Sequence, residues 1–229
     1  ILGHNRLAIR DLNETGHQPL ENDAGVLCYN GEIYNSNDLL EEMVKHDPTF
    51  KLKGSSDTEI LLNYITIFGL KKTLDVINGI YAFAYYDKHE NKVYLIRDRM
   101  GIKPLYYMLI NDSLIFASNL SALFLSVKEI LNYNLTLNLE AVYFYLLSSG
   151  VFEGETFIKN IYKLESASCL EYDLKTLTKK IYWEPNVRYD EITSLLKNSI
   201  EINKIADVPV SVLFSGGIDS SIVANYCEG

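Results

Sequence analysis

Residues 210–221 read VSVLFSGGIDSS, a mostly apolar run that leads directly into two glycines and a new helical segment. Residues 210–214, opened by Pro209, are predicted to form a strand. Gly216 and Gly217 then allow a tight turn before the helix. A strand, a glycine turn and a helix in this order begin a parallel α/β unit, so an α/β domain is predicted to start here.

The loop SGGIDS, residues 215–220, has the composition of a phosphate-binding turn. Its glycines let the backbone approach a ligand, its two serines add hydroxyl donors, and the helix amides point to the same place. It lacks the lysine of the GxxxxGK[ST] loop, so transfer of a γ-phosphate is not indicated. Asp219 would repel a bare phosphate, which favours Mg²⁺ bound with the phosphates. A plain glycine turn would use the same residues, and the pattern leaves both interpretations open.

Composition narrows the possible classes of protein. The chain has 229 residues, 48% hydrophobic and 22% charged, which fits an ordinary globular protein of one or two domains and excludes a disordered tail, a fibre or a coiled coil. Its net charge of −9 argues against binding nucleic acid or an anionic membrane. The three cysteines are widely spaced, so reduced thiols in the cytoplasm fit better than disulfides or a zinc cluster. No apolar run approaches the ~18 residues of a membrane span.

The first 186 residues are expected to form an α+β sandwich, and the remainder to begin the α/β domain, with the boundary within residues 184–190. A strand at 25–29 is predicted to end in a tight turn at Asn30-Gly31, and two strands at 81–86 and 92–96 to form a hairpin with buried aromatic side chains. The other predicted helices lie at 38–44, 140–147 and 190–203, with one more that is capped by residues 55–57 and ended by Gly69. The other predicted strands lie at 113–117, 167–172 and 179–183.

Arg6, Asn30, Gly31 and Asp57 form a second group of candidate functional residues. An arginine binds a carboxylate, an aspartate binds an ammonium group, and an amide with a backbone N–H can stabilise an oxyanion. Together they suit an α-amino acid with a reacting carbonyl, although spacing alone favours a surface arginine, a turn and a helix cap. Residues 97–101 (RDRMG) are predicted to form a buried ion-pair corner at a turn, with a functional site as the other interpretation. The four isolated histidines suggest no metal site.

Eight stretches occur in a fixed order along nearly the whole chain. They are GHNRLAIRDL (3–12), GHQPL (16–20), NGEIYN (30–35), SSDTEILL (55–62), INGIYAFAYYD (77–87), IRDRMGIKPLYY (96–107), FAS (116–118) and DVPVSVLFSGGIDSS (207–221). With this ordered set the chain resembles the glutamine-hydrolysing asparagine synthetase family.

The resemblance implies a glutaminase (glutamine amidotransferase type 2) domain at residues 1–186, an N-terminal-nucleophile hydrolase with an αββα sandwich. It implies at 187–229 the first strand, loop and helix of an ATP-pyrophosphatase domain, which is adenine nucleotide alpha hydrolase-like. Glutamine would supply ammonia, and aspartate would attack the α-phosphate of ATP, with Mg²⁺, to give β-aspartyl-AMP and then asparagine. The substrates expected are thus glutamine, aspartate and ATP, and the resemblance is compatible with a homodimer.

The same resemblance assigns roles to individual residues. Asn30 and Gly31 would form the oxyanion hole, and no protein metal site is expected, with Mg²⁺ held near Asp219 together with ATP. The residues expected to bind glutamine are Arg6, Leu7, Ala8, Ile9, Arg10, Asn30, Gly31, Glu32 and Asp57. Those expected to bind ATP or pyrophosphate are Phe214, Ser215, Gly216, Gly217, Ile218, Asp219 and Ser220.

Several departures from the family pattern matter. The family nucleophile is an amino-terminal cysteine upstream of Ile1, and Cys28, Cys169 and Cys227 are not expected to replace it. Because the chain opens without Met and stops within a helix, we expect a fragment that does not itself hydrolyse glutamine. Asn119 stands where a glutamate is usual, and residues 165–168 (ESAS) replace a Pro-Pro-Gly-type turn.

Two other functions stay open on the sequence. One is a relative with the same architecture and another acceptor, such as a glycan, a peptide or a β-lactam precursor. The residue after the initiator Met would separate a β-lactam-forming synthetase, which has lost the catalytic cysteine. The other is a non-enzymatic glutaminase-like binding module, against which the SGGIDSS loop argues.

Overall fold

A computed structural model describes residues 1–186 and 191–227. The predicted start of a helix at Asp190 and the predicted division between residues 186 and 187 lie at or within the undescribed segment. Among the described helices, none combines the length and the apolar character that crossing a membrane requires.

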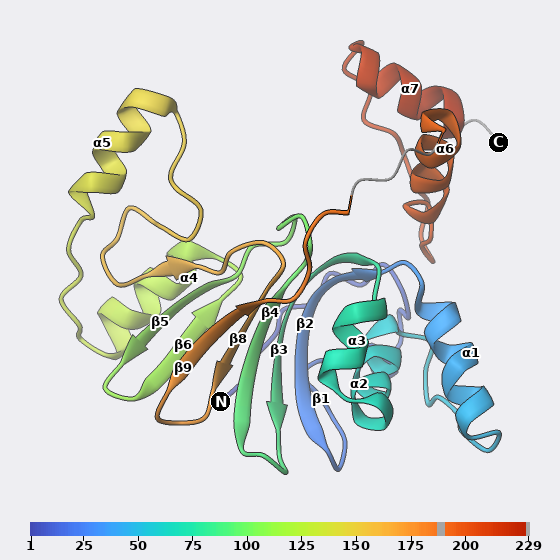
Figure 1. Ribbon diagram of the computed structural model, residues 1–229, viewed down its shortest axis with the longest axis horizontal. Coiled ribbons are helices and arrows are strands. Elements are labelled where there is room, and N and C mark those ends of the chain that lie inside the picture. Colours follow the sequence, from blue (N-terminus) through green and yellow to red (C-terminus); the bar gives the residue numbers. More distant parts are fainter. Residues whose placement is uncertain (187–190, 228–229) are drawn as a thin grey trace.

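The larger of two sheets has six antiparallel strands (Figure 1). In spatial order they are β1 (Leu20–Glu21), β2 (Gly25–Ile33), β3 (Gly79–Asp87), β4 (Lys92–Arg97), β8 (Ser168–Tyr172) and β9 (Leu177–Ile181). The predicted hairpin is confirmed as β3 and β4, with Phe83 opposite Ile96. The alternation of Tyr81, Phe83 and Tyr85 places all three side chains in the core, as expected for a strand period of two.

A second antiparallel sheet packs against the first. Its strands are β6 (Ser113–Ala117), β5 (Tyr106–Ile110) and β7 (Tyr162–Lys163), in that spatial order. Buried Ala84, Leu95 and Leu170 of the first sheet pack near Leu114 and Phe116 of the second, which makes an apolar layer between the sheets. This is the sheet-on-sheet part of the predicted sandwich.

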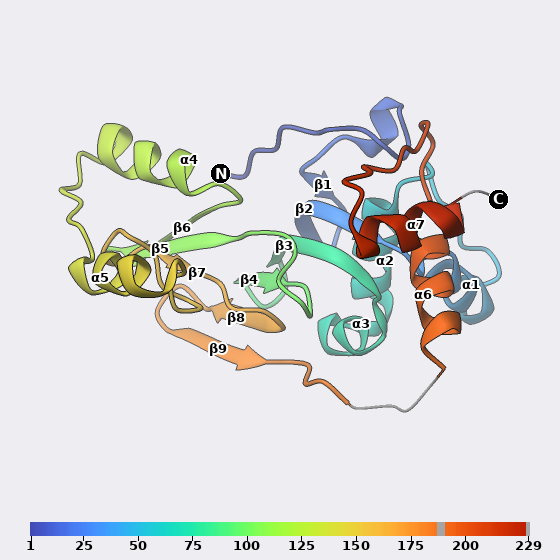
Figure 2. The same ribbon diagram turned by 90° about the horizontal axis from the view of Figure 1, so that it is seen from above.

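Helices cover the outer face of each sheet (Figures 1 and 2). The helices α1 (Ser36–His46), α2 (Asp57–Phe68) and α3 (Leu70–Val76) lie against β2 and β3, and α4 (Leu120–Leu125) lies against β5 and β6. The result is the predicted four-layer αββα order. The remaining elements of this part are η1 (Glu14–Gly16), η2 (Ser126–Ile130) and α5 (Leu139–Ser148), which extends away from the sheets.

Local sequence explains where α2 begins and ends. The hydroxyl of Ser56 accepts the Glu59 N–H at 3.2 Å, which satisfies one of the free amides of the first turn. The Glu59 carboxylate in turn accepts the N–H groups of Lys53 and Gly54, both at 2.8 Å. Gly69 ends the helix with φ +83°, a conformation that glycine adopts without strain. The helix therefore holds Asp57 at a fixed position on its first turn.

The tight turn predicted at Asn30-Gly31 is wrong, because β2 continues through both residues to Ile33. Gly31 lies opposite Tyr81, and a Cβ on Gly31 would lie 2.1 Å from the carbonyl oxygen of Ile80. The glycine is thus required by a close approach of two strands rather than by a turn.

The ion-pair corner predicted at residues 97–101 is also wrong for the described chain, although the side chains of Arg97 and Asp98 are buried. Arg97 donates to backbone carbonyls, and Asp98 accepts backbone N–H groups. The carbonyls belong to Gly101, Lys103 and Leu164, and the N–H groups to Tyr81, Met100, Ile102 and Lys103. Each charge is solvated by the backbone, which fixes the turn after β4.

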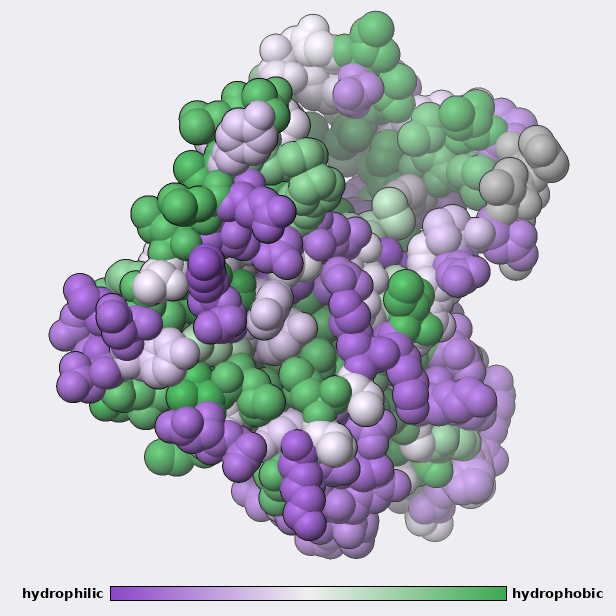
Figure 3. Space-filling model, turned by 60° about the vertical axis from the view of Figure 1, so that its left-hand side comes forward, coloured by the Kyte–Doolittle hydropathy of each residue, from purple (hydrophilic) through white to green (hydrophobic). Residues whose placement is uncertain are grey.

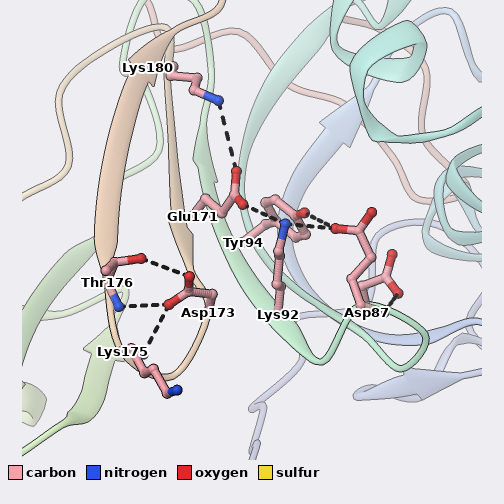
Figure 4. A network of polar contacts seen from close by, with 9 residues as sticks. Asp87, Lys92, Tyr94, Glu171, Asp173, Lys175, Thr176 and Lys180 are labelled. Atoms are coloured by element: carbon pink, nitrogen blue, oxygen red, sulfur yellow. Dashed lines mark hydrogen bonds and ion pairs between the residues drawn. The ribbon is translucent and has the colours of Figure 1, made fainter.

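A polar network lies where β4 and β8 pair (Figure 4). The Lys92 ammonium lies 2.8 Å from Glu171 across the strands and 3.0 Å from Glu90, which also accepts the Tyr94 hydroxyl at 2.9 Å. Solvent-exposed pairs of this kind contribute little to overall stability, so they mainly favour the register of β4 and β8.

The C-terminal part contains α6 (Ile192–Ile202) and α7 (Ile218–Cys227). The strand predicted at residues 210–214 is wrong: these residues lie in no strand, and Leu213 is 95% exposed. A parallel strand needs neighbours to pair with, and the described residues offer none at this position. Figure 3 shows that the upper part of the molecule, which includes α5 and the C-terminal helices, carries much of the apolar surface.

Candidate functional site

A cavity of about 560 Å³ opens where the first residues of the chain cross β2 and the start of α2. Its walls bring together segments far apart in sequence: residues 3–10, residues 28–32, Asp57 and residues 116–119. The group of candidate residues predicted from the sequence therefore meets in one place.

Arg6 lines this cavity and is fixed by backbone carbonyls. Its guanidinium donates to the carbonyls of Arg10 and Asp11, the latter at 2.7 Å, and more weakly to that of Asn13 at 3.4 Å. These bonds use three of its five N–H donors and leave two for a ligand. The guanidinium also lies over Gly16, where a Cβ would be 2.3 Å from both terminal nitrogens. The positive charge is therefore held in one place before any ligand binds.

Asp57 supplies a buried negative charge to the same cavity. Its side chain is 6% exposed, and Oδ2 accepts the Tyr29 hydroxyl at 2.8 Å and the Ile33 N–H at 3.0 Å. Burial, followed by the Asp57 charge, raises the pKa of Tyr29 well above its usual value, so Tyr29 stays a hydrogen-bond donor. The first turn of a helix favours a carboxylate at this position.

The strand edge of β2 presents three backbone amides toward the same side. Alternate residues of a strand direct their N–H groups to one edge, so those of Tyr29, Gly31 and Ile33 share it. Gln18 Oε1 accepts the first at 2.6 Å and Asp57 Oδ2 accepts the last at 3.0 Å. Among the described residues no side chain accepts the Gly31 N–H between them. This amide, with Asn30 beside it in the cavity wall, can donate to a ligand oxygen.

Glu32 is half-buried in the same wall. Burial, followed by the charge of Asp57, raises its pKa above the ordinary 4.5, while Arg10 and Lys103 act in the opposite direction. The cavity thus contains two carboxylates and three cations close to the free amide of Gly31, which suits a zwitterionic ligand.

Of the residues that follow Arg6, some line the cavity and others do not. Leu7, Ile9 and Arg10 line the cavity, whereas Ala8 lies outside its lining. Leu7 is 87% exposed. Arg10 donates to the Ser36 hydroxyl at 3.1 Å and to the Ile33 carbonyl at 3.4 Å, so it fastens the segment to the start of α1.

Among the residues of the cavity wall that sequence reasoning missed are His4, Cys28 and Lys103. Cys28 donates to the Gly3 carbonyl at 3.5 Å, and burial raises the pKa of its thiol. Burial also lowers the pKa of His4, whose Nδ1 has no partner in the described part of the chain. A strand period of two, counted back from Asn30, would have placed Cys28 on the same face.

The glycine loop at residues 215–220 does not join this cavity. Ser215 and Ser220 share a hydrogen bond of 3.1 Å, and Ser220 also donates to the Gly217 carbonyl at 3.1 Å. Gly216 has φ +81°, which fits a glycine turn, and Asp219 lies exposed on the first turn of α7. Phe214 and Ile218 are 63% and 80% exposed. The loop presents its hydroxyls and helix amides to solvent.

Asn119 and residues 165–168, which depart from the family pattern, have clear structural roles. Asn119 lines the cavity and accepts the N–H groups of Ser121 and Ala122, which caps α4. Ala167 has φ +53°, a conformation that favours glycine, and its N–H donates to the Asp98 carbonyl at 2.9 Å. Both departures therefore leave the local backbone intact.

Comparison with known proteins gives matches along the whole chain. The family model described as glutamine amidotransferase domain matches residues 1–183, and the one described as asparagine synthase matches residues 191–228. A putative glutamine-hydrolysing asparagine synthetase 2 of Methanocaldococcus jannaschii is 35% identical, with 97% of this chain and 47% of that protein covered. The asparagine synthetase 2 of Bacillus subtilis is 34% identical over 96% of this chain and 32% of its own length.

Solved structures agree on the fold. The glutamine phosphoribosylpyrophosphate amidotransferase of Bacillus subtilis matches with a TM-score of 0.53 and 18% identity, covering 96% of this chain and 48% of that one. The chain spans about half the length of the relatives it matches, or less. The match over residues 1–183 shows that the chain belongs to the glutamine amidotransferase domain family, joined to the start of an asparagine synthase domain.

Proposed function

We propose that this chain contributes the glutamine-hydrolysing half, and the first part of the ATP-using half, of an asparagine synthetase. The observation that carries the proposal is one cavity lined by the fixed Arg6 guanidinium, the Asp57 carboxylate and Gly31, whose N–H no described side chain accepts. The curated relatives are named asparagine synthetases, which supports the acceptor.

Each end of glutamine has a partner in the cavity. The remaining donors of Arg6 suit the α-carboxylate, and Asp57 with Glu32 suits the α-ammonium group. The side-chain amide carbonyl would then face Asn30 and the Gly31 N–H. These donors would stabilise the negative charge that develops on the oxygen when a nucleophile adds to the carbon.

Cys28 is not proposed as the attacking thiol. Cys28 lies in the wall, but its proton is held toward the Gly3 carbonyl and its pKa is raised by burial. A thiol attacks as the thiolate, so this environment suits a packing residue rather than a nucleophile.

For the ATP-using half, the exposed SGGIDS loop fits the pyrophosphate portion of a nucleotide. Helix amides and the Ser215 and Ser220 hydroxyls would hold phosphate oxygens. Mg²⁺ typically takes one or two carboxylates and otherwise phosphates and water, which fits Asp219 as a single exposed carboxylate. When bound, the ion would neutralise charge on the phosphates. The described residues contain no cluster of three or more metal-ligating side chains.

The test uses the full-length gene product with Mg-ATP, glutamine and aspartate, and follows pyrophosphate, glutamate and asparagine together. We expect asparagine and pyrophosphate to form in step, with glutamate from the amide donor. Glutamate without asparagine would contradict aspartate as acceptor and point to another acceptor on the same architecture. No glutamate at all would contradict the glutaminase half.

A further inference from the structure

Asp207 joins the segment before the glycine loop to the segment that carries Arg6. The Asp207 N–H donates to the Ile9 carbonyl at 2.9 Å, and its carboxylate Oδ2 accepts the Asp11 N–H at 2.8 Å. Figure 2 shows the beginning of the chain and the stretch before α7 running near each other, although they are almost 200 residues apart in sequence. One residue therefore makes a two-point contact with the cavity segment.

Asp11, which contacts Asp207, also contacts Arg6 and the loop that precedes Asp57. Its carbonyl accepts Arg6 at 2.7 Å, so one residue lies between the Asp207 carboxylate and the Arg6 guanidinium. Its own carboxylate is 2% exposed and accepts the Ser55 N–H at 3.1 Å, two residues before Asp57. The contact thus reaches the group proposed to bind the carboxylate and the loop that precedes α2.

Asp11 is itself firmly held, so it can transmit a shift of Asp207. Burial alone would raise the pKa of its carboxyl, but hydrogen bonds from Ser55, Thr15 and Asn13 outweigh burial and leave the pKa below its usual value. A Cβ on Gly54 would lie 2.5 Å from Asp11 Oδ2, so there is little room for this carboxylate to move. Because Asp11 is held in place, the contact can change only if Asp207 moves.

Asp207 also leads directly into the glycine loop. Only residues 208–214 separate it from Ser215, and Pro209 restricts the backbone within them. Another contact between the two parts, from the Tyr34 hydroxyl to Asn203 Oδ1 at 2.6 Å, lies on α6's C-terminal side and makes no bond to the Arg6 segment. The two contacts can therefore be separated by mutation.

We propose that Asp207 is a positioning residue that holds the Arg6 segment from the nucleotide-binding half, so that glutamine affinity depends on a residue outside the glutaminase domain. The proposal rests on the proposed function above. Because coupling between two binding sites is reciprocal, glutamine in the cavity also restrains the segment that leads to the glycine loop.

The test compares Asp207→Ala, Asp207→Asn and the control Asn203→Ala in the full-length gene product. Asp207→Ala is expected to raise KM for glutamine about five- to tenfold with a smaller change in kcat, because the hydrogen bond to the Asp11 N–H is lost. Asp207→Asn keeps an acceptor oxygen and is expected to recover most of the affinity. Asn203→Ala and the ammonia-dependent reaction are expected to stay near wild type.

A second readout does not require activity: amide hydrogen exchange of residues 3–13. Asp207→Ala is expected to speed exchange in this segment, whereas Asn203→Ala is not. Unchanged KM and unchanged exchange in Asp207→Ala would overturn the proposal, as would an equal loss of the glutamine- and ammonia-dependent reactions. If the wild-type protein hydrolyses no glutamine, the proposed function fails, and the exchange comparison alone decides whether Asp207 positions the segment.

Discussion

The cavity around Arg6 and Asp57 and the glycine loop at residues 215–220 both contain residues predicted from short motifs, but the described chain builds them to different degrees. In the cavity, Arg6 donates to three backbone carbonyls, and Asp57, which is 6% exposed, accepts the Tyr29 hydroxyl and the Ile33 N–H. In the loop, Phe214 and Ile218 are largely exposed, and the serine hydroxyls bond to each other or to the loop backbone. A site whose side chains are fixed by hydrogen bonds and packing has its binding geometry before a ligand arrives, so it is preorganised. A site whose groups face solvent takes its final geometry only when a ligand binds.

The largest expected effect tests the preorganised site. Asp57→Asn is expected to lower kcat/KM for glutamine about 100-fold, because a buried charge that faces the ammonium group is lost. The ammonia-dependent synthesis of asparagine should remain. Steady-state kinetics with glutamine and with ammonium chloride would check both expectations.

A matched control for this change is Asp38→Asn, an exposed aspartate in the first turn of α1. It should leave both reactions unchanged, since it lies outside the cavity. If Asp57→Asn reduced both reactions equally, Asp57 would be acting on the stability of the whole protein rather than on glutamine.

The second-largest expected effect tests the exposed glycine loop. Here asparagine synthesis, and not glutamine hydrolysis, is expected to be lost. Asp219→Asn is expected to reduce asparagine synthesis with either nitrogen donor about 30-fold, because the carboxylate proposed to lie beside Mg²⁺ and phosphate is lost. Glutamine hydrolysis should persist. Pyrophosphate and glutamate release, measured in parallel, would separate the two halves.

Glu201→Gln, an exposed change on α6, is the control for Asp219→Asn. Normal pyrophosphate release by Asp219→Asn would remove the loop from the proposed nucleotide site and leave a plain glycine turn.

A smaller effect is expected from crowding Arg6. Gly16→Ala would place a Cβ 2.3 Å from the guanidinium nitrogens, so the side chain must move. We expect KM for glutamine to rise about tenfold, because a displaced guanidinium loses much of its binding geometry. Gly150→Ala, where a Cβ meets nothing within 4 Å, is the matched control. An unchanged KM would mean that Arg6 has room to keep its contacts.

The sequence predicted most elements correctly because their signals are local. Ser56 and Gly69 bound α2 as their side chains and dihedral preferences require, and the alternation of Phe83 and Tyr85 marks a strand. The Asn30-Gly31 turn was wrong because the same dipeptide also permits the close approach of two strands, which depends on β3, about 50 residues away in the sequence. The strand at 210–214 was wrong because pairing partners decide whether an apolar run forms a strand.

The candidate site could be predicted only in part for the same reason. The group of Arg6, Asn30, Gly31 and Asp57 came from their chemical types, and family resemblance added Glu32. The hydrogen bond from Asp11 to Asp207 spans 196 residues and leaves no local pattern in the sequence. Contacts of this kind follow from the packing of distant segments.

The last prediction concerns the pH dependence of the preorganised site. Burial and Asp57 raise the pKa of Glu32 above 4.5 in the folded protein. If Glu32 must be ionised to hold the ammonium group, kcat/KM for glutamine should fall as the pH drops through this raised value, at a higher pH than an unperturbed glutamate would give. The measurement is the pH profile of kcat/KM for glutamine, with the ammonia-dependent rate measured at each pH.

Glu32→Gln removes the group that titrates and should shift the acid limb of this profile to lower pH, with a modest loss of affinity at neutral pH. Ionisation of Glu32 lowers the free energy of unfolding, whereas ionisation of a salt-bridged carboxylate raises it. A raised pKa means that ionising Glu32 costs folding free energy, so this cost is absent below the unfolded pKa and complete above the folded one. Glu32→Gln should therefore stabilise the free protein slightly at neutral pH while weakening glutamine binding. An acid limb that the substitution does not move would contradict Glu32 as the group whose ionisation this profile reports.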